Sequence, residues 1–244
     1  MNSRKLKYTG LVAALPLALA ACSSSNSGSP AGSGATATTA VAGSTTQLTG
    51  TQLKGALLSA TDVGTGFTAS TDSAVDSGGS LTTAAAKYKP ASISCPDLLN
   101  EMGQTGFGES AMADDTLEND TSGELLNQVV YQFASATAAN VFFTSLEAKW
   151  NSCGSFTETD SSSGTTGKVT IVAAAAPSGL GDMAFSNTMT ATESSTTMSG
   201  TNLAVLKGVD VFIVGPDKVG GGLPTDLSAQ TLAQKLMSNV AAVG

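Results

Sequence analysis

The sequence predicts a single domain of the α+β class, an antiparallel β-sheet with flanking α-helices, preceded by a signal peptide and a disordered tether. Three observations support this fold class. Segments of strand character follow one another as hairpins and do not alternate one by one with helices. Amphipathic helical segments stand near the start, the middle and the end of 51–244. The first 50 residues have a different composition from the rest. A second domain within 51–244 is the less favoured alternative.

Helical spacing of apolar residues appears at three places, in 51–64, 136–150 and 226–240. The first helix is expected to end near 62–64. Ser135 can cap the second, in which the bulky side chains recur at i, i+4 and i+8 and are expected in the core. These side chains are Phe142, Leu146 and Trp150. A further helix is expected to start at Cys95-Pro96, because proline is common in the first turn.

Strand alternation is clearest in 125–133. Residues 129, 131 and 133 fall on one face, and Gln128 and Gln132 fall on the other, which predicts a half-buried strand. The segments 168–175 and 184–192 are also predicted as strands. The segment 202–214 is predicted as a hairpin that turns at Lys207-Gly208, where the glycine supplies the positive φ that such a turn requires.

The first 21 residues have the features of a signal peptide. A positive region with Arg4, Lys5 and Lys7 precedes an apolar stretch over 11–21, which is too short to span a bilayer. The stretch ends in Leu19-Ala20-Ala21-Cys22, which resembles the bacterial lipobox. That resemblance implies cleavage between Ala21 and Cys22, diacylglycerol on the Cys22 sulfur, and a fatty acyl group such as palmitate on its new N-terminus. The alternative is an ordinary secretory signal in which Cys22 is incidental.

Residues 22–50 are expected to form the lipidated cysteine and a tether. The segment 23–50 is rich in Ser, Thr, Gly and Ala and contains no charged and no aromatic residue. Such a segment cannot offset its ordering entropy by burial, so disorder is expected. It would hold the domain off the membrane without fixing its orientation.

The overall composition excludes several classes of site. The chain has no histidine, which excludes Ser-His-Asp and Cys-His catalytic sites and imidazole metal sites within it. Its 11 Lys and Arg against 19 Asp and Glu give a net charge of −8, which argues against a nucleic-acid partner. The common nucleophile, phosphate-binding and dinucleotide motifs do not occur. We therefore expect no catalytic residue, no metal and no cofactor.

Two cysteines, Cys95 and Cys153, remain besides Cys22. Outside the cytoplasmic membrane two such cysteines tend to pair, and the alternative is two unpaired buried thiols. A catalytic thiol is disfavoured because the chain has no histidine to activate it.

Four segments occur in an order that resembles a known family. They are Leu57–Gly64, Cys95-Pro96-Asp97-Leu98, Trp150-Asn151-Ser152-Cys153 and Gly179-Leu180-Gly181-Asp182. Their order is similar to that of the sensor-like extracellular domains of actinobacterial, mycobacterial-type lipoproteins and of PknH-like receptor Ser/Thr kinases. The resemblance implies an antiparallel sheet with helices around a cleft, and a Cys95–Cys153 disulfide. The kinase sensor carries a second disulfide, for which this chain has no cysteines left.

Three further segments are candidate sites. The acidic segment 114–120 is interpreted as a solvated loop, with a weak Ca²⁺ site or a patch for a basic partner as alternatives. The glycine-rich segment 215–222 is interpreted as a mobile connector, with an anion cradle as the alternative. Gly181-Asp182 is interpreted as a turn with a capping carboxylate.

The function expected from these features is a non-enzymatic, lipid-anchored sensor or ligand-binding lipoprotein of the cell envelope, on the outer face of the cell membrane. Its expected partners are the membrane, through Cys22, and an unidentified small-molecule, lipid or cell-wall ligand bound at residues that the sequence leaves unknown. The alternative is a carrier of apolar envelope ligands such as lipids. A hydrolase is disfavoured for lack of a nucleophile motif.

Overall fold

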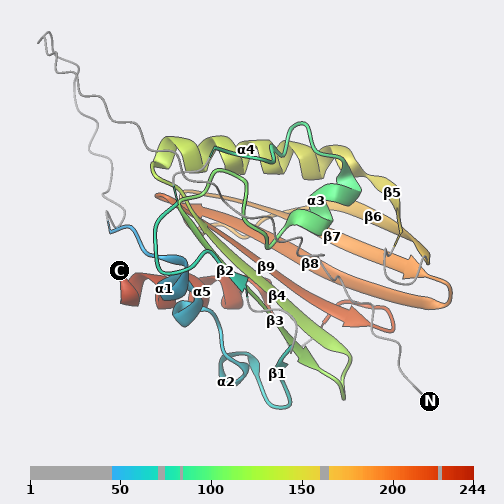
Figure 1. The fold of residues 1–244 in the computed structure, drawn as a ribbon. Helices are drawn as coiled ribbons and strands as arrows, with labels where there is room; N and C mark the ends of the chain where they lie inside the picture. Colours follow the sequence, from blue (N-terminus) through green and yellow to red (C-terminus); the bar gives the residue numbers. More distant parts are fainter. Residues whose placement is uncertain (1–45, 71–74, 83–84, 160–164, 225–226) are drawn as a thin grey trace, which may run out of the picture.

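The computed structural model describes residues 46–70, 75–82, 85–159, 165–224 and 227–244. They form one nine-stranded sheet in the order β1-β3-β4-β9-β8-β7-β6-β5, and β2 also pairs with β3 (Figure 1). Every pairing in it is antiparallel. The predicted class, an antiparallel sheet with flanking helices, is confirmed. Cys22 and the predicted signal peptide lie outside the described residues.

The helices are α1 (Gly50–Ala56), α2 (Ala60–Val63), α3 (Cys95–Glu101), α4 (Ala136–Cys153) and α5 (Ala229–Val243). The strands are β1 (Thr68–Ala69), β2 (Val75–Asp76), β3 (Ala111–Asn119), β4 (Glu124–Gln132), β5 (Ser155–Thr159), β6 (Thr166–Ala174), β7 (Met183–Glu193), β8 (Thr196–Lys207) and β9 (Asp210–Val219). No helix within the described part of the chain is both long and apolar enough to cross a bilayer.

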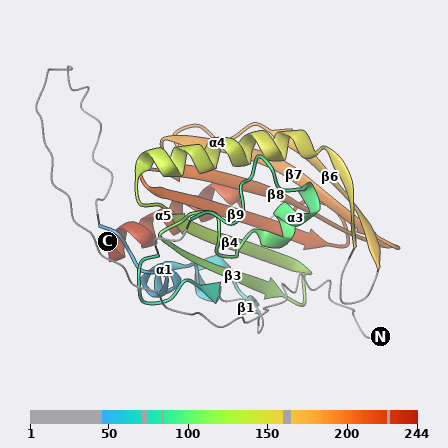
Figure 2. The same ribbon diagram turned by 45° about the horizontal axis from the view of Figure 1, so that its top comes forward.

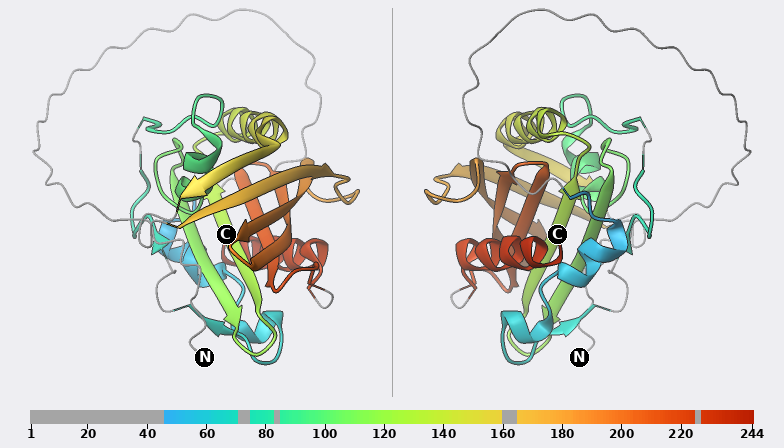
Figure 3. Two further views of the ribbon diagram at one scale, coloured as in Figure 1. Left: turned by 90° about the vertical axis from the view of Figure 1, so that its right-hand side faces the viewer. Right: turned by 90° about the vertical axis from the view of Figure 1, so that its left-hand side faces the viewer.

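Helices cover both faces of the sheet. Helices α3 and α4 lie on one face, here called the α4 face, and α1 and α5 lie on the other, here called the α5 face (Figures 1 and 2). The end-on views show the three layers, with α4 and α5 on opposite sides of the strands (Figure 3). Each face has its own hydrophobic cluster, because the side chains of a strand alternate between faces.

The two clusters draw on alternate residues of the same strands. On the α4 face, Phe142, Leu146 and Trp150 pack against the strands, which confirms their predicted place in the core. On the α5 face, Leu232 and Leu236 of α5 pack against residues of β8 and β9. Burying each such side chain contributes roughly 1.5–3 kcal/mol, so the two clusters together hold the layers in register.

Side-chain caps start the helices where the sequence predicts them. Ser135 accepts a hydrogen bond from the backbone N–H of Ala138 at the start of α4, and Ser94 does the same for α3, which has a proline in its first turn. The first predicted helix is instead two short helices, α1 and α2, because the backbone is extended at Leu57. The chain is already packed before position 51, since Leu48 is buried.

The prediction that β4 is half-buried is wrong, because both of its faces are covered along most of its length, with Asn127 as the exposed exception. Gln128 and Gln132 are buried on the α5 face. The Gln128 amide accepts a hydrogen bond from the backbone N–H of Leu58 at 2.8 Å and donates one to the carbonyl of the same residue at 2.8 Å. Gln132 accepts from the backbone N–H of Leu48 at 2.6 Å. Polar side chains are buried here because they satisfy the backbone of the segments around α1.

Two predicted loops are strands. Residues 114–119 of the acidic segment belong to β3, which pairs with β4 on one side and with β1 and β2 on the other. Residues 215–219 of the glycine-rich segment belong to β9, between β4 and β8. Pairing with long neighbouring strands outweighs the weak intrinsic strand preference of Asp, Glu and Gly.

Candidate functional site

Of the site residues predicted from the sequence, Ala21 and Cys22 lie outside the described residues, and Cys95 and Cys153 form a disulfide. The two sulfur atoms are 2.08 Å apart and the two Cα atoms 5.7 Å apart. The bond joins the first residue of α3 to the last residue of α4 across 58 positions. Closing a loop of this length contributes up to about 4 kcal/mol in the chain-entropy account. The bond therefore has a structural role, since it fixes α3 beside α4.

The predicted turn at Gly181-Asp182 is confirmed. The Asp182 carboxylate accepts a hydrogen bond from the backbone N–H of Gly208 at 2.7 Å, and so closes the turn between β8 and β9. Gly208 has φ +63°, as predicted. Asp182 is exposed and its oxygen is committed to this turn, which makes it a structural residue.

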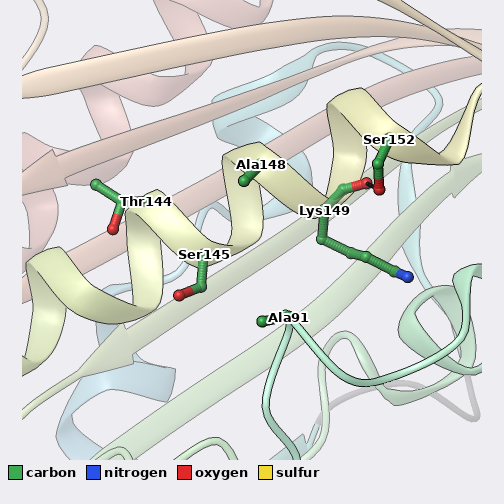
Figure 4. Close-up of a pocket in the computed structure, with 6 residues that line it drawn as sticks. All are labelled: Ala91, Thr144, Ser145, Ala148, Lys149 and Ser152. Carbon is green, nitrogen blue, oxygen red and sulfur yellow. Dashed lines mark hydrogen bonds between the residues drawn. The ribbon is translucent and has the colours of Figure 1, made fainter.

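A surface pocket of about 370 Å³ lies on the outer side of α4 (Figure 4). It is lined by one residue of the loop before α3 and five of α4: Ala91, Thr144, Ser145, Ala148, Lys149 and Ser152. The Thr144 and Ser152 hydroxyls already donate hydrogen bonds to carbonyls of the helix. The polar groups left for a ligand are the Lys149 ammonium and the Ser145 hydroxyl, which would suit a small anion. The pocket is on the outer surface and not between sheet and helix, where the family resemblance implies a cleft.

A stronger candidate lies on the α4 face of the sheet itself, in a group of polar side chains here called the polar row. Its members come from five consecutive strands of the sheet and share the face of the α4 cluster. They are Thr116 on β3, Asn127 on β4, Asp217 on β9, Asn202 on β8 and Asn187 on β7.

Strand register brings the row together. Thr116 is paired with Asn127, and Asn202 is paired with Asn187. Asp217 is paired with Gly200 of β8 and lies opposite Leu125 of β4. Directly paired residues point to the same face, so all five side chains emerge on the α4 side.

Two glycines make room for the row. A Cβ atom added at Gly200 would overlap the Oδ1 oxygen of Asp217. A Cβ atom added at Gly215 would lie 2.5 Å from the Oδ1 oxygen of Asn202. The Asp217 carboxylate therefore leans from β9 over β8, and the Asn202 amide leans from β8 over β9. A glycine within a strand often marks such a close approach.

Hydrogen bonds connect the members of the row into two chains. Thr116 Oγ1 donates to Asn127 Oδ1 at 3.0 Å, and Asn127 Nδ2 donates to Asp217 Oδ2 at 2.9 Å. Asn202 Nδ2 donates to Asn187 Oδ1 at 3.2 Å. Two buried atoms have no hydrogen-bond partner among the described residues, Asp217 Oδ1 and Asn187 Nδ2. Because an unpaired buried polar group costs about 1–3 kcal/mol, these two atoms call for an explanation.

The charge of the row is unusual as well. Burial raises the pKa of Asp217 to about 7, and the hydrogen bond from Asn127 only partly opposes this rise. In the neighbouring position of the α4 face, burial raises the pKa of Asp114 to about 8, with the nearby Asp115 carboxylate acting in the same direction. Perturbed carboxyl groups of this kind are concentrated at functional sites.

The row reaches solvent at one end. Asn127 is exposed, and Thr116 and Asn202 are half-buried, whereas Asp217 and Asn187 are each 1% exposed. An exposed side chain on a central strand means that α3 and α4 leave this part of the sheet uncovered. Leu125 and Ile213, both half-buried, supply apolar surface beside Asn127. The row therefore has an exposed part at Asn127 and two buried polar atoms without partners, Asp217 Oδ1 and Asn187 Nδ2.

This chemistry favours binding. No group of three or more Cys, Asp and Glu side chains in the described ranges is placed to hold a metal ion. The row offers one carboxylate, three amides and a hydroxyl, which act as hydrogen-bond donors and acceptors. These groups can orient a polar molecule, and nothing among them forms a nucleophile and base pair.

Sequence reasoning missed the row, although a signal for it exists. In β4, Asn127 stands between Leu125 and Val129 on a face that is otherwise apolar. In β7, Asn187 stands in the same way between Phe185 and Met189. A polar residue at an inward position of an alternating strand is the feature that could have identified it.

Comparisons with known proteins agree with this fold. Residues 48–233 match the family described as the PknH-like extracellular domain. The crystal structure of the extracellular domain of PknH from Mycobacterium tuberculosis is similar, with a TM-score of 0.58 and 16% sequence identity. The match covers 82% of this chain and all of that one. The structure of an uncharacterized protein of Mycobacterium smegmatis, the Rv0999 ortholog, matches with a TM-score of 0.36 at 12% identity and covers 75% of this chain and 91% of that one.

No curated protein matches the chain. The family match spans more than half of the sequence, and it contains both cysteines of the disulfide and every member of the polar row. A family of extracellular domains implies an extracytoplasmic location. The chain belongs to the family of PknH-like extracellular domains.

Proposed function

We propose that this protein is a lipid-anchored, extracytoplasmic sensor that binds a polar ligand at the polar row and is not an enzyme. The observation that carries the binding part is the pair of buried, unpaired atoms Asp217 Oδ1 and Asn187 Nδ2, the first of them on a carboxylate that is hydrogen-bonded to the exposed Asn127. Folding leaves these two atoms without partners at a cost in stability. A ligand that supplies the missing hydrogen bonds recovers that cost, and this is a typical feature of binding sites.

The anchoring part is supported by the lipobox-like segment that ends at Cys22 and by membership of a family of extracellular domains. Two or three acyl chains on Cys22 would give a firm anchor, since each buried CH₂ group contributes about 0.8 kcal/mol. The domain would then face the outside of the cell membrane, where its ligand arrives.

The support for a polar ligand is stronger than for the carrier alternative. A lipid carrier needs a deep apolar cavity. Four of the six residues that line the surface pocket on α4 are polar, and the uncovered part of the sheet carries the amides of Asn127 and Asn202. Both places suit hydrogen bonding better than the uptake of an acyl chain.

Metabolic labelling tests the anchor. The protein is produced in its host with a clickable fatty-acid analogue, alongside the Cys22→Ala variant. We expect label on the unmodified chain and none on the variant, which should no longer sediment with the membrane. An unlabelled chain that is released into the medium would overturn the anchor.

Native mass spectrometry tests the binding. The chain is purified from its host and compared with the variants Asp217→Asn and Asn187→Leu, and with Asn140→Leu as the control, because Asn140 is exposed on α4. We expect a small-molecule adduct on the unmodified chain and the control, and less or none on the two row variants. An adduct that is equally abundant on all four proteins would place the ligand elsewhere.

A further inference from the structure

The unpaired atoms of the row also restrict the chemistry of the ligand; this inference rests on the proposed function and extends it. The unpaired set consists of one acceptor, Asp217 Oδ1, and one donor, Asn187 Nδ2. A cation would satisfy the carboxylate oxygen only. An anion would satisfy the amide N–H only, and the carboxylate would repel it. A neutral group that both donates and accepts satisfies the two atoms together.

We propose that the polar row binds a neutral, polyhydroxylated ligand of the carbohydrate class, with one hydroxyl donating to Asp217 Oδ1 and another accepting from Asn187 Nδ2. A hydroxyl group is the natural partner here because it carries one donor and two acceptor positions. A sugar presents several hydroxyls side by side, so a single ring can meet both protein atoms without any charge of its own.

The spacing of the strands fits a ligand of this size. Asp217 and Asn187 stand on β9 and β7, which flank β8. Neighbouring strands are about 4.8 Å apart, so the two backbones are separated by roughly 10 Å, and Asp217 leans inward over Gly200. The two unpaired atoms thus belong to strands on either side of β8, and a ligand with several hydroxyls can offer a separate group to each.

A sugar has polar hydroxyl groups and apolar C–H groups, and the side chains around the row can contact both. The amides of Asn127 and Asn202 offer further hydrogen bonds at the open end. Leu125 and Ile213 lie half-buried beside Asn127 and can pack against the C–H groups of a ring. On the same face, Met189 is paired with Gly200, and Met198 lies two residues before that glycine on β8. Their flexible thioethers can adapt to an incoming ligand.

For a ligand to reach the buried atoms of the row, side chains must move slightly. Asn127 is exposed and makes the hydrogen bond that holds Asp217 Oδ2. Rotation of the Asn127 amide toward solvent would uncover the carboxylate. One ligand hydroxyl can then take its place at Oδ2, in addition to the hydroxyl that donates to Oδ1. The exchange conserves the number of hydrogen bonds, so its cost is modest.

The test uses the purified chain labelled with ¹⁵N and observes the side-chain NH₂ signals of its asparagines. The probes are methyl α-glycosides of glucose, galactose and mannose, each added separately, with calcium chloride, sodium phosphate and an alkyl ammonium salt as competing classes. We expect saturable shifts of the Asn187 and Asn127 side-chain signals with at least one glycoside, and no shift of these signals with the three salts.

Variants locate the binding. Asn187→Leu and Asp217→Asn should each weaken glycoside binding at least tenfold, and Asn140→Leu should leave it unchanged; the backbone spectrum of each variant shows whether it is folded. Shifts of the Asn127 or Asn187 side-chain signals produced by calcium or ammonium would overturn the carbohydrate class in favour of a cation, and shifts produced by phosphate would overturn it in favour of an anion. Glycoside binding that survives both row variants would also overturn it.

The outcome separates this inference from the proposed function. If no glycoside binds but the host-purified chain carries an adduct that the row variants lose, the sensor function stands and the ligand belongs to another class. If neither glycoside binding nor a row-dependent adduct is found, both proposals fail.

Discussion

The two faces of the sheet bury polar side chains in opposite ways. On the α5 face, Gln128 and Gln132 are buried and every polar atom of their side chains has a partner, supplied largely by the backbone around α1. On the α4 face, Asp217 and Asn187 are buried to the same degree, but one polar atom of each is left unpaired. Burial of a polar residue therefore does not by itself reveal its role; the state of its hydrogen bonds does.

The largest effect is expected on the α5 face. Replacing Gln128 by leucine keeps the volume but leaves the backbone N–H and carbonyl of Leu58 buried and unpaired. Two such groups cost about 1–3 kcal/mol each, so the free energy of unfolding should fall by roughly 2–6 kcal/mol, measured by urea denaturation. Gln230→Leu is the control, because Gln230 is exposed on α5 and should change stability by less than about 0.5 kcal/mol. A loss no larger than that of the control would show that the hydrogen bonds between Gln128 and Leu58 do not stabilise the fold.

The disulfide tests how α3 is held on the α4 face. The double variant Cys95→Ser with Cys153→Ser should lower the free energy of unfolding by up to about 4 kcal/mol, because the 58-residue loop is no longer closed in the unfolded chain. The same denaturation experiment measures it. The α5 face should be unaffected, so amide exchange in α5 should slow or quicken only in line with the global stability. Selective loss of protection in α5 would argue against independent faces.

The pH dependence of stability should differ in sign between the faces. The folded pKa of Asp217 is raised from 3.8 to about 7, so between these values the folded state binds more protons than the unfolded state. Its contribution therefore falls as pH rises from about 4 to 7, by up to about 4 kcal/mol. Asp114, with a pKa of about 8, has the same sign and extends the fall to about pH 8.

On the α5 side, Asp62 lies 2.8 Å from the Lys235 ammonium, and the hydrogen bond from that lysine lowers its pKa to about 2. The stability it contributes is present above about pH 4 and is lost as pH falls toward 2. We expect Asp217→Asn to flatten the stability curve between pH 4 and 7. We expect Asp62→Asn to lower stability by a constant amount above about pH 4 and to remove the slope between about pH 2 and 4. Denaturation midpoints across pH measure both, and a curve of unchanged slope in Asp217→Asn would contradict the assignment.

A smaller effect is expected from the glycine beneath Asp217. Gly200→Ala places a methyl group where the Asp217 Oδ1 oxygen lies. Overpacking of this kind costs about 1–3 kcal/mol. The side-chain NH₂ signal of Asn127 should also shift, because its partner carboxylate is displaced. Gly55→Ala is the control, since nothing lies within 4 Å of a Cβ added there. Equal stability of the two variants would mean that Asp217 does not occupy this space.

Much of the fold could be predicted from local sequence patterns. Ser135 and the stripe of Phe142, Leu146 and Trp150 predicted α4, and Gly208 predicted the turn between β8 and β9. These signals depend on residues close together in sequence. The acidic strand β3 could not be predicted in this way, because its strand state depends on pairing with β4 and with the distant strands β1 and β2.

The site was harder to predict than the fold for the same reason. Asn127, Asn187, Asn202 and Asp217 lie up to 90 positions apart and meet only through strand register. The anchor, in contrast, is a local pattern ending at Cys22, and the sequence alone was enough to propose it. Gln128 and Asn127 are adjacent in sequence, yet Gln128 is buried and Asn127 is exposed. The alternation of the strand alone could not predict which of the two would be buried.

The free energy of unfolding of Asn187→Leu in the ligand-free chain distinguishes a ligand-binding row from a purely structural one. Asn187 Nδ2 is buried and unpaired, and Asn202, which would lose its partner, is half-buried and can turn to water. We predict that the variant is more stable than the unmodified chain by about 1 kcal/mol, while the same kind of change at Gln128 destabilises it. A loss of stability at Asn187 comparable to that at Gln128 would contradict the account, since the row would then be part of the structural core.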